Sequence, residues 1–151
     1  MVTTIKRAIA RTSMSKRRPA TIDRIVIVSD DDALQKILHR LFPSEGYAVD
    51  VIQNNLLGLI SLCQRPPSAV VLDVADPDSS DFDLCRRIAN LIPDLPLVIL
   101  APGLELVYKA RLLEMGCDDY LAIPFSPRDL LQRVRAAIER RARIGLQNLL
   151  A

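Results

Sequence analysis

Five short apolar runs, each followed by a segment of helical periodicity, dominate this chain from residue 24 onward. The runs are Ile25–Val28, Tyr47–Ile52, Ala69–Asp73, Leu97–Ala101 and Asp119–Ala122. The third and fourth are almost wholly apolar, which is typical of parallel strands that are buried on both faces. We therefore predict a strand at each of the five runs.

Between and after these runs, apolar residues recur every three or four positions, as they do on one face of a helix. They are Leu34, Ile37, Leu38 and Leu41; Leu56, Leu59, Ile60 and Cys63; Phe82, Cys85 and Ile88; Leu104, Val107 and Leu112; Leu130, Val134, Ala137 and Ile138. Parallel strands need a crossover element between them, and helices supply it. The alternation predicts an α/β fold: a doubly wound (βα)5 domain with a parallel five-stranded sheet and helices on both faces.

Capping residues agree with this periodicity. Asp32 is a plausible N-cap of the first helix, and Ser126 with Pro127 is a typical start of the last one. Gly116 is placed to end the fourth helix.

Length and composition favour one domain. A chain of 151 residues that is 50% hydrophobic and 25% charged can form one core of ordinary size. We expect a globular domain over residues 23–143, a disordered basic extension over 1–22 and a short tail over 144–151. No run approaches the roughly 18 apolar residues that cross a bilayer, and no secretory signal is evident, so we expect a cytoplasmic protein.

The charges divide the chain into a basic extension and an acidic body. Residues 1–22 carry six basic side chains and no acidic one, which leaves 14 basic and 18 acidic side chains in residues 23–151. Such an extension could contact nucleic acid or an anionic membrane surface. A solvated leader without a partner is the simpler interpretation. The three cysteines, Cys63, Cys85 and Cys117, lie among apolar neighbours without C-x-x-C spacing, and we expect reduced thiols in the core.

Two carboxylates follow predicted strands at their carboxyl ends, where open α/β sheets usually have their functional sites. Asp73 ends the third apolar run and Asp30 follows the first. The carboxyl ends of parallel strands meet at one edge of the sheet, where ligands of such folds bind. We expect Asp30 and Asp73 to lie at that edge, although a merely solvated strand end is the simpler interpretation of Asp73.

Three segments carry a resemblance to a known family. They are residues 24–32 (RIVIVSDDD), 67–77 (PSAVVLDVADP) and 115–127 (MGCDDYLAIPFSP), and the last is the most specific. Over about residues 23–141 the chain resembles the receiver domains of bacterial two-component response regulators, which have the CheY-like form of the flavodoxin-like fold.

The resemblance implies transfer of a phosphoryl group from a histidine kinase to Asp73. It also implies Mg²⁺ held by Asp73, Asp30 and the backbone carbonyl of Ala75. A cation is needed because a carboxylate that attacks a phosphoryl group brings negative charge toward negative charge. Magnesium prefers oxygen ligands of this kind.

Four positions depart from the family pattern. Ser29 replaces the first residue of the usual acidic pair, Asp81 stands at a usual glycine, Ala101 replaces a Thr or Ser, and Ile123 replaces a lysine. The lost hydroxyl and ammonium would each remove a bond worth about 1.5–3 kcal/mol. These losses favour a pseudo-receiver, with no enzymatic activity, that acts through protein contacts largely independently of phosphorylation. A working Mg²⁺-dependent phospho-acceptor at Asp73 is the alternative, with Mg²⁺ bound weakly.

Two other classes are less consistent with the residues. A phosphatase of the haloacid dehalogenase type needs an aspartate two residues after its nucleophile, where this chain has Ala75. A flavin-binding flavodoxin needs a phosphate-binding loop after the first strand, and the carboxylates at 30–32 would repel a phosphate.

The resemblance also implies a contact surface. Receivers attached to winged-helix DNA-binding domains dimerise through their fourth helix, fifth strand and fifth helix. The matching pairs here are Lys109 with Asp129, Asp119 with Arg133, and Glu114 with Arg135, related by a two-fold axis. Tyr120 matches the family's aromatic switch, and the Ile123–Pro124 bond matches one that is cis in the family.

Overall fold

The computed structural model describes residues 22–74, 81–103 and 106–150. The strands are β1 (Arg24–Val28), β2 (Ala48–Ile52), β3 (Ala69–Asp73), β4 (Leu97–Pro102) and β5 (Asp119–Ile123). The helices are α2 (Asp32–Ser44), α3 (Leu56–Gln64), α4 (Asp81–Leu91), α5 (Leu106–Glu114) and α6 (Pro127–Leu150). All five predicted strands are confirmed, and each of their ends lies within one residue of its predicted position. Among the described residues no helix has the length and apolar character to span a membrane.

The strands form one parallel sheet in the order β2-β1-β3-β4-β5. The chain goes outward from β1 to β2 and then crosses back to β3. The direction of winding therefore reverses between β1 and β3, which pair along Val28 and Leu72. In open α/β sheets this reversal opens a crevice at the carboxyl ends of the strands.

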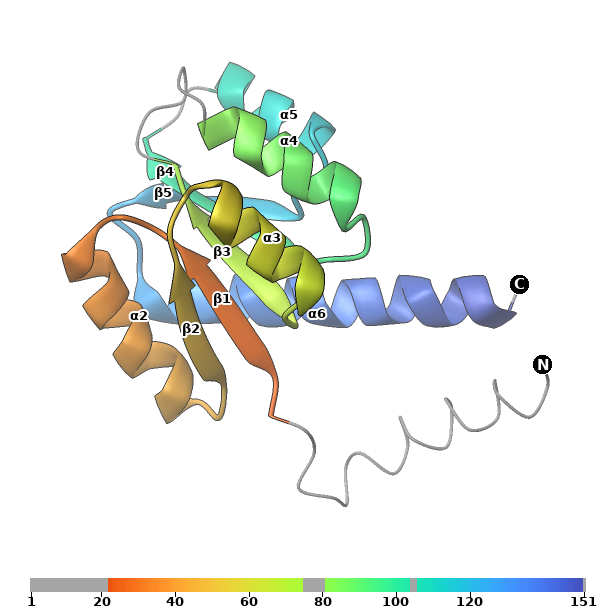
Figure 1. The fold of residues 1–151 in the computed structure, drawn as a ribbon, viewed down its shortest axis with the longest axis horizontal. Helices are drawn as coiled ribbons and strands as arrows, with labels where there is room; N and C mark the ends of the chain where they lie inside the picture. Colours follow the sequence, from red (N-terminus) through yellow and green to blue (C-terminus); the bar gives the residue numbers. More distant parts are fainter. Residues whose placement is uncertain (1–21, 75–80, 104–105, 151) are drawn as a thin grey trace.

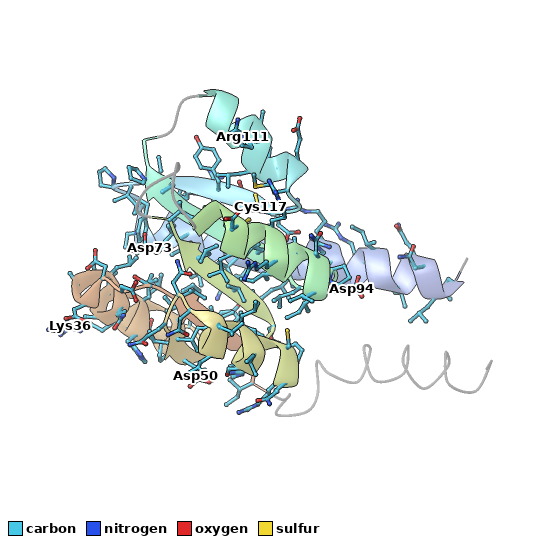
Figure 2. All side chains as sticks on the ribbon, turned by 45° about the horizontal axis from the view of Figure 1, so that its top comes forward. Lys36, Asp50, Asp73, Asp94, Arg111 and Cys117 are labelled. Carbon is cyan, nitrogen blue, oxygen red and sulfur yellow. The ribbon has the colours of Figure 1, made fainter. Side chains whose placement is uncertain are left out.

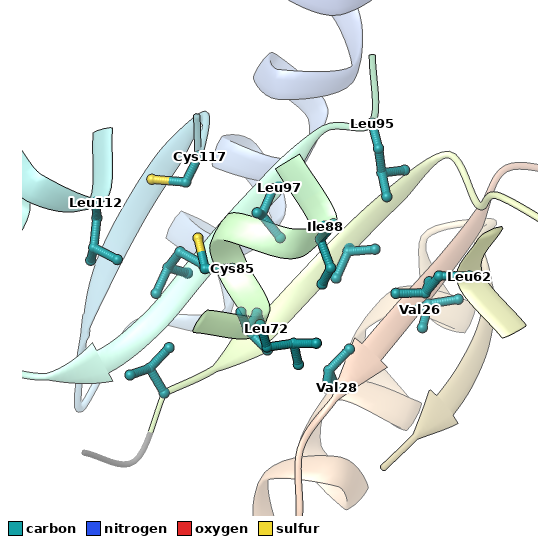
Figure 3. Close-up of a cluster of buried hydrophobic side chains, with 14 of the residues drawn as sticks. Val26, Val28, Leu62, Leu72, Cys85, Ile88, Leu95, Leu97, Leu112 and Cys117 are labelled. Atoms are coloured by element: carbon teal, nitrogen blue, oxygen red, sulfur yellow. The ribbon is translucent and has the colours of Figure 1, made fainter. Parts of the chain in front are cut away.

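Alternating side chains of each strand enter two separate cores. Ile25 and Ile27 point to the face covered by α2 and α6, where Phe42 is fully buried. Val26 and Val28 point to the opposite face, which α3, α4 and α5 cover (Figures 1 and 3). The predicted doubly wound fold with helices on both faces is confirmed.

Local signals set most of the helix ends, with one correction. The N-cap of α2 is Asp31, one residue before the predicted Asp32, and its carboxylate accepts hydrogen bonds from the backbone N–H groups of Ala33 and Leu34. The start of α6 at Pro127 is confirmed. Gly116 follows α5 with a φ of 101°, a left-handed conformation that favours glycine.

Helix α6 is longer than predicted. It continues through residue 150, so residues 144–150 belong to this helix and do not form a separate tail. Residues 1–21 of the basic extension lie outside the described ranges.

Arg141 and Asp118 hold α6 to the sheet, and we call this pair the clamp. Arg141 donates to both carboxylate oxygens of Asp118, at 2.7 and 3.2 Å, and to the carbonyl of Pro93 at 2.7 Å. The same carboxylate accepts from the backbone N–H of Leu97 at 2.7 Å.

The cysteines fall into two environments. Cys85 and Cys117 lie in the core between the sheet and α4 and α5, where burial raises the pKa of Cys85 to about 11 and that of Cys117 to about 12 (Figure 3). Cys63 is exposed on α3, so the prediction of a core thiol is wrong at this position. Cys63 belongs to helix α3, as its spacing predicts, but its side chain lies on the side of α3 that faces away from the sheet.

Replacing Asp118 by Ala should destabilise the fold. The Asp118 side chain is 4% exposed, and its loss would remove the carboxylate that pairs with Arg141 and leave the N–H of Leu97 without its acceptor. We expect the free energy of unfolding to fall by about 3 kcal/mol, measured by urea denaturation. Asp50→Ala is the control, because Asp50 is 54% exposed in its pair with Arg24 and should cost less than about 1 kcal/mol. Equal losses in the two variants would contradict the clamp.

Thiol titration should separate the three cysteines. In the native protein near pH 8 we expect one thiol to react rapidly with Ellman's reagent, because a protonated buried thiol is a poor nucleophile. That thiol is Cys63, so Cys63→Ser should leave no rapid reaction, whereas all three should react after unfolding. Rapid reaction of a second thiol in the folded state would show that the core around Cys85 and Cys117 opens.

Candidate functional site

Asp73 lies at the carboxyl end of β3, next to the point where the winding of the sheet reverses. Its carboxylate is half-buried, and its backbone is beside Leu100 of β4. Figure 2 shows Asp73 at one end of the sheet and Asp94, which precedes β4, toward the opposite end. Because Val28 pairs with Leu72, the residue that follows β1 comes directly beside Asp73. That residue is Ser29.

Ser29 connects β1, β3 and α2 through its polar atoms. Its side chain is only 2% exposed, and its Oγ donates a hydrogen bond to Oδ2 of Asp73 at 2.9 Å. The same Oγ accepts from the backbone N–H of Asp31 at 3.0 Å. Its carbonyl accepts from Nε2 of Gln35 at 2.7 Å. Ser29 is thus a buried polar residue at the carboxyl end of β1.

The three successive aspartates at 30–32 have different positions. The side chain of Asp31 caps the amino end of α2, and Asp32 is exposed in the first turn of this helix. Asp30 is exposed at the tip of β1, the edge of the sheet to which Asp73 also belongs. The structure therefore keeps Asp30 and Asp73 at the same edge, as predicted.

These residues fit a tightly held Mg²⁺ poorly. Within the described ranges no three His, Cys, Asp or Glu side chains are grouped so that they could hold a metal ion. Of the predicted ligands, Asp73 accepts the hydrogen bond of Ser29, which fills one position of the family's acidic pair. The carbonyl of Ala75 lies outside the described residues. Among the described residues, the predicted oxygen ligands are therefore the carboxylates of Asp30 and Asp73, and magnesium prefers several oxygen ligands.

The two positions that would contact a phosphoryl group are apolar. Ala101 is fully buried in the core next to α4 and α5. Ile123 is 37% exposed beside Pro102, and the cis bond predicted between Ile123 and Pro124 is confirmed. Ile123 also lines a pocket of about 240 Å³, whose other walls include Leu34, Ile37 and Phe125. The apolar side chain of Ile123 thus occupies the position at which the family has the ammonium group of a lysine.

Tyr120 is partly buried against the same core, and its ring lies under the ammonium of Lys109. The Nζ atom is 5.2 Å from the ring centroid, a distance at which a cation and an aromatic face attract each other. The contact joins α5 to β5 on the surface predicted for dimerisation.

Arg133 is the centre of that surface. Its guanidinium donates to Oδ1 of Asp119 at 2.9 Å and to Oδ1 of Asp129 at 3.1 Å within the same chain. Burial lowers the pKa of Arg133, but the bonds and charges of the two carboxylates outweigh this effect and raise it overall. Within one chain Arg133 thus pairs with Asp119, and the predicted pair between two copies stays a prediction.

Arg135 has its own intramolecular partners. It donates to Oε2 of Glu45 at 3.1 Å and to the hydroxyl of Tyr47 at 3.2 Å, so it lies on the flank of α6 that faces α2 and β2. Arg133 lies on the other flank, toward β5. Glu114 is exposed at the end of α5. The predicted pairing of Glu114 with Arg135 of a second copy stays a prediction.

Sequence reasoning missed Gln35, which holds the carbonyl of Ser29. Its position one turn into α2 carried no signal, since an isolated glutamine on a helix is ordinary. Asp31 was also missed as the cap, because three adjacent aspartates satisfy the capping rule almost equally.

Comparison with known proteins identifies the family of this chain. The model of the response regulator receiver domain matches residues 25–135. The transcriptional regulatory protein CreB of Escherichia coli is 37% identical over 118 residues, and the response regulator MprA of a Mycobacterium species is 35% identical over 117. Each match covers 78% of this chain and 52% or 51% of the relative. The chain thus spans about half the length of the curated relatives it matches.

Solved structures share the fold. A CheY-like receiver domain protein of Methanospirillum hungatei aligns with a TM-score of 0.72 at 23% identity, over 83% of this chain and all of the other. NtrX of Brucella abortus aligns with a TM-score of 0.77 at 20% identity, over 87% of this chain and 30% of the other. By the match over residues 25–135, the chain belongs to the family of response regulator receiver domains.

Proposed function

We propose that this chain is a receiver module of a two-component system that acts through protein contacts, largely independently of phosphorylation at Asp73. The observation that carries the proposal is the hydrogen bond from buried Ser29 to Asp73, at the position where the family has an acidic residue. A neutral donor holds the acceptor carboxylate there. In this proposal the chain binds partner proteins and transmits a signal, and it does not catalyse a reaction.

Charge balance supports this proposal. A phosphoryl group on Asp73 would add negative charge beside Asp30, and the side chains at 101 and 123 supply neither a hydroxyl nor a cation. In the family these groups stabilise the modified state through charge-assisted bonds that are about twice as strong as neutral ones. Without them the modified state is poorly stabilised. Position 101 also offers no hydroxyl group to which the switch residue Tyr120 could respond.

A working phospho-acceptor is the second candidate. Asp30 and Asp73 are both present at the edge of the sheet, and the two curated relatives at 37% and 35% identity are named as regulators. In this case Asp30, Asp73 and the carbonyl of Ala75 would hold Mg²⁺. The metal would supply charge that the protein side chains lack. A histidine kinase would then be the phosphoryl donor.

The surface made of Lys109, Glu114, Asp119, Asp129 and Arg133 is the proposed protein-contact surface. A second copy could use it, but Arg133 would then exchange its own carboxylates for equivalent ones. Exposed ion pairs contribute about 0–1 kcal/mol each, so this exchange would fix orientation more than affinity. The basic extension, as a contact for nucleic acid or an anionic membrane surface, belongs to the same proposal as a secondary contact.

Intact mass after incubation with acetyl phosphate and Mg²⁺ tests the proposal. We expect wild type to gain no stable phosphoryl group, because the groups that retain it are missing. A variant that restores them, Ser29→Asp with Ala101→Thr and Ile123→Lys, should gain one group and serves as the positive control. A gain in wild type that is absent from Asp73→Asn would favour the second candidate.

Response to Mg²⁺ provides an independent prediction. Ser29→Asp replaces the hydrogen bond with a second carboxylate near Asp73, so without metal we expect a loss of about 1–3 kcal/mol in unfolding free energy. Millimolar Mg²⁺ should restore much of that loss and raise the melting temperature of this variant by several degrees.

Ser29→Ala is the matched control, since it removes the bond without adding charge. It should lose about 1 kcal/mol and show no response to Mg²⁺. Wild type should respond little. A response in wild type as large as that of Ser29→Asp would mean that Asp30 and Asp73 already hold the metal well.

A further inference from the structure

A groove lies at the amino ends of β1, β3 and β4, at the end of the sheet opposite Asp73. Its volume is about 540 Å³, within the range of about 300–1,000 Å³ that is usual for ligand-binding pockets. Most of its wall is apolar and comes from the segments that precede β3 and β4 and from α6. These wall residues include Pro66, Pro67, Leu95, Pro96, Ile138 and Ala142.

Two exposed aspartates give the groove a negative charge. Asp23 directly precedes β1, and Asp94 precedes β4 (Figure 2 labels Asp94). The third charged residue of the groove, Arg141, pairs with both carboxylate oxygens of Asp118, so that pair is neutral as a whole. An occupant that fits the groove is therefore apolar along the wall and basic near Asp23 or Asp94.

The amino-terminal extension of this chain joins the domain at this groove. Asp23 is the point of entry, and two hydrogen bonds hold it. The hydroxyl of Ser68 donates to Oδ1 of Asp23 at 2.9 Å, and the carbonyl of Asp23 accepts from the N–H of Ala48 at 2.9 Å. Ser68 also lines the groove, so its bond ties the point of entry to the groove wall. A segment tethered in this way has an effective concentration on the order of millimolar, at which a weak contact forms.

We propose that residues 17–21 of the same chain fill the groove, with the uncharged residues 19–21 along the apolar wall and the two arginines at 17 and 18 beside Asp94. Strands β1 and β4 are two strand spacings apart because β3 lies between them, which is about 10 Å. An extended chain covers about 3.3 Å per residue, so residues 19–22 cross this distance. The arginines then reach the far end of the groove.

The sequence of this segment, RRPAT, suits the contact. Pro19 fixes its own φ and restricts Arg18 to extended conformations, so less conformational entropy is lost than for an unrestricted chain. Pro19 and Ala20 also bury apolar surface with almost no loss of side-chain entropy. The two adjacent arginines supply the positive charge that the groove lacks. The basic residues of the extension that lie farther from the groove in sequence are Lys6, Arg7 and Arg11.

Charge reversal in the full chain, followed by amide NMR, tests the proposal. Arg17→Glu combined with Arg18→Glu should release the segment, because like charges would then meet at Asp94, and should shift the resonances of Leu95 and Ile138. Adding Asp94→Lys to that variant restores opposite charges and should return both resonances toward their wild-type positions.

A matched control makes this test specific. Lys6→Glu with Arg7→Glu changes the net charge by the same amount farther from the groove, and it should leave the resonances of Leu95 and Ile138 in place. Equal spectra of wild type and the variant with glutamates at 17 and 18, or equal shifts in the control, would overturn the proposal. Shifts of these resonances on dilution of wild type would assign the groove to the extension of a second copy and would also overturn it.

Trypsin cleavage gives a second readout. Asp94→Asn should speed cleavage after Arg17 by about threefold, because it weakens the contact and cleavage follows the population of the released segment. Cleavage after Arg7 should keep its wild-type rate. Asp94 is exposed, so the fold should be unchanged, and circular dichroism checks this. Asp73→Asn should cleave like wild type, since the proposal does not rest on the proposed function. Equal rates after Arg17 in wild type and Asp94→Asn would contradict the contact.

Discussion

Burial of the central strands on both faces is the constraint on which the rest of the molecule depends. The side chains of β1 and β3 enter cores on both sides of the sheet, so polar side chains of these strands are left at the strand ends. Ser29 and Asp73 meet there because Val28 pairs with Leu72. The same burial requires every covering helix to present an apolar face inward, which α3 does with Leu59 and Leu62.

The site keeps the acceptor carboxylate and changes what surrounds it. A receiver that stores a phosphoryl group needs positive charge where negative charge accumulates. Here Asp73 accepts a hydrogen bond from the neutral hydroxyl of Ser29, and the positions at 101 and 123 are aliphatic. The fold and the charged surface around Arg133 do not depend on those groups. Under the proposed function, the contacts of the module do not require that chemistry.

Strands were predictable to within a residue because parallel strands buried on both faces are continuous apolar runs bounded by polar residues. Side-chain partners were less predictable, since they depend on the flank of a helix and on strands distant in sequence. Arg133 and Arg135 differ by two positions and lie on opposite flanks of α6. The same limit applies to Cys63, whose spacing fits the helix but not the buried side. The role of Gln35 required the turn between β1 and α2 to be known.

The most direct test of the central claim is whether a phosphoryl mimic at Asp73 reaches the surface of α5, β5 and α6. Amide NMR spectra recorded with and without beryllofluoride and Mg²⁺ report this residue by residue. The account predicts that resonances of Lys109, Asp119, Tyr120 and Arg133 stay unchanged. Coordinated shifts of these resonances that are absent in Asp73→Asn would show a coupled switch and contradict an output that is independent of phosphorylation.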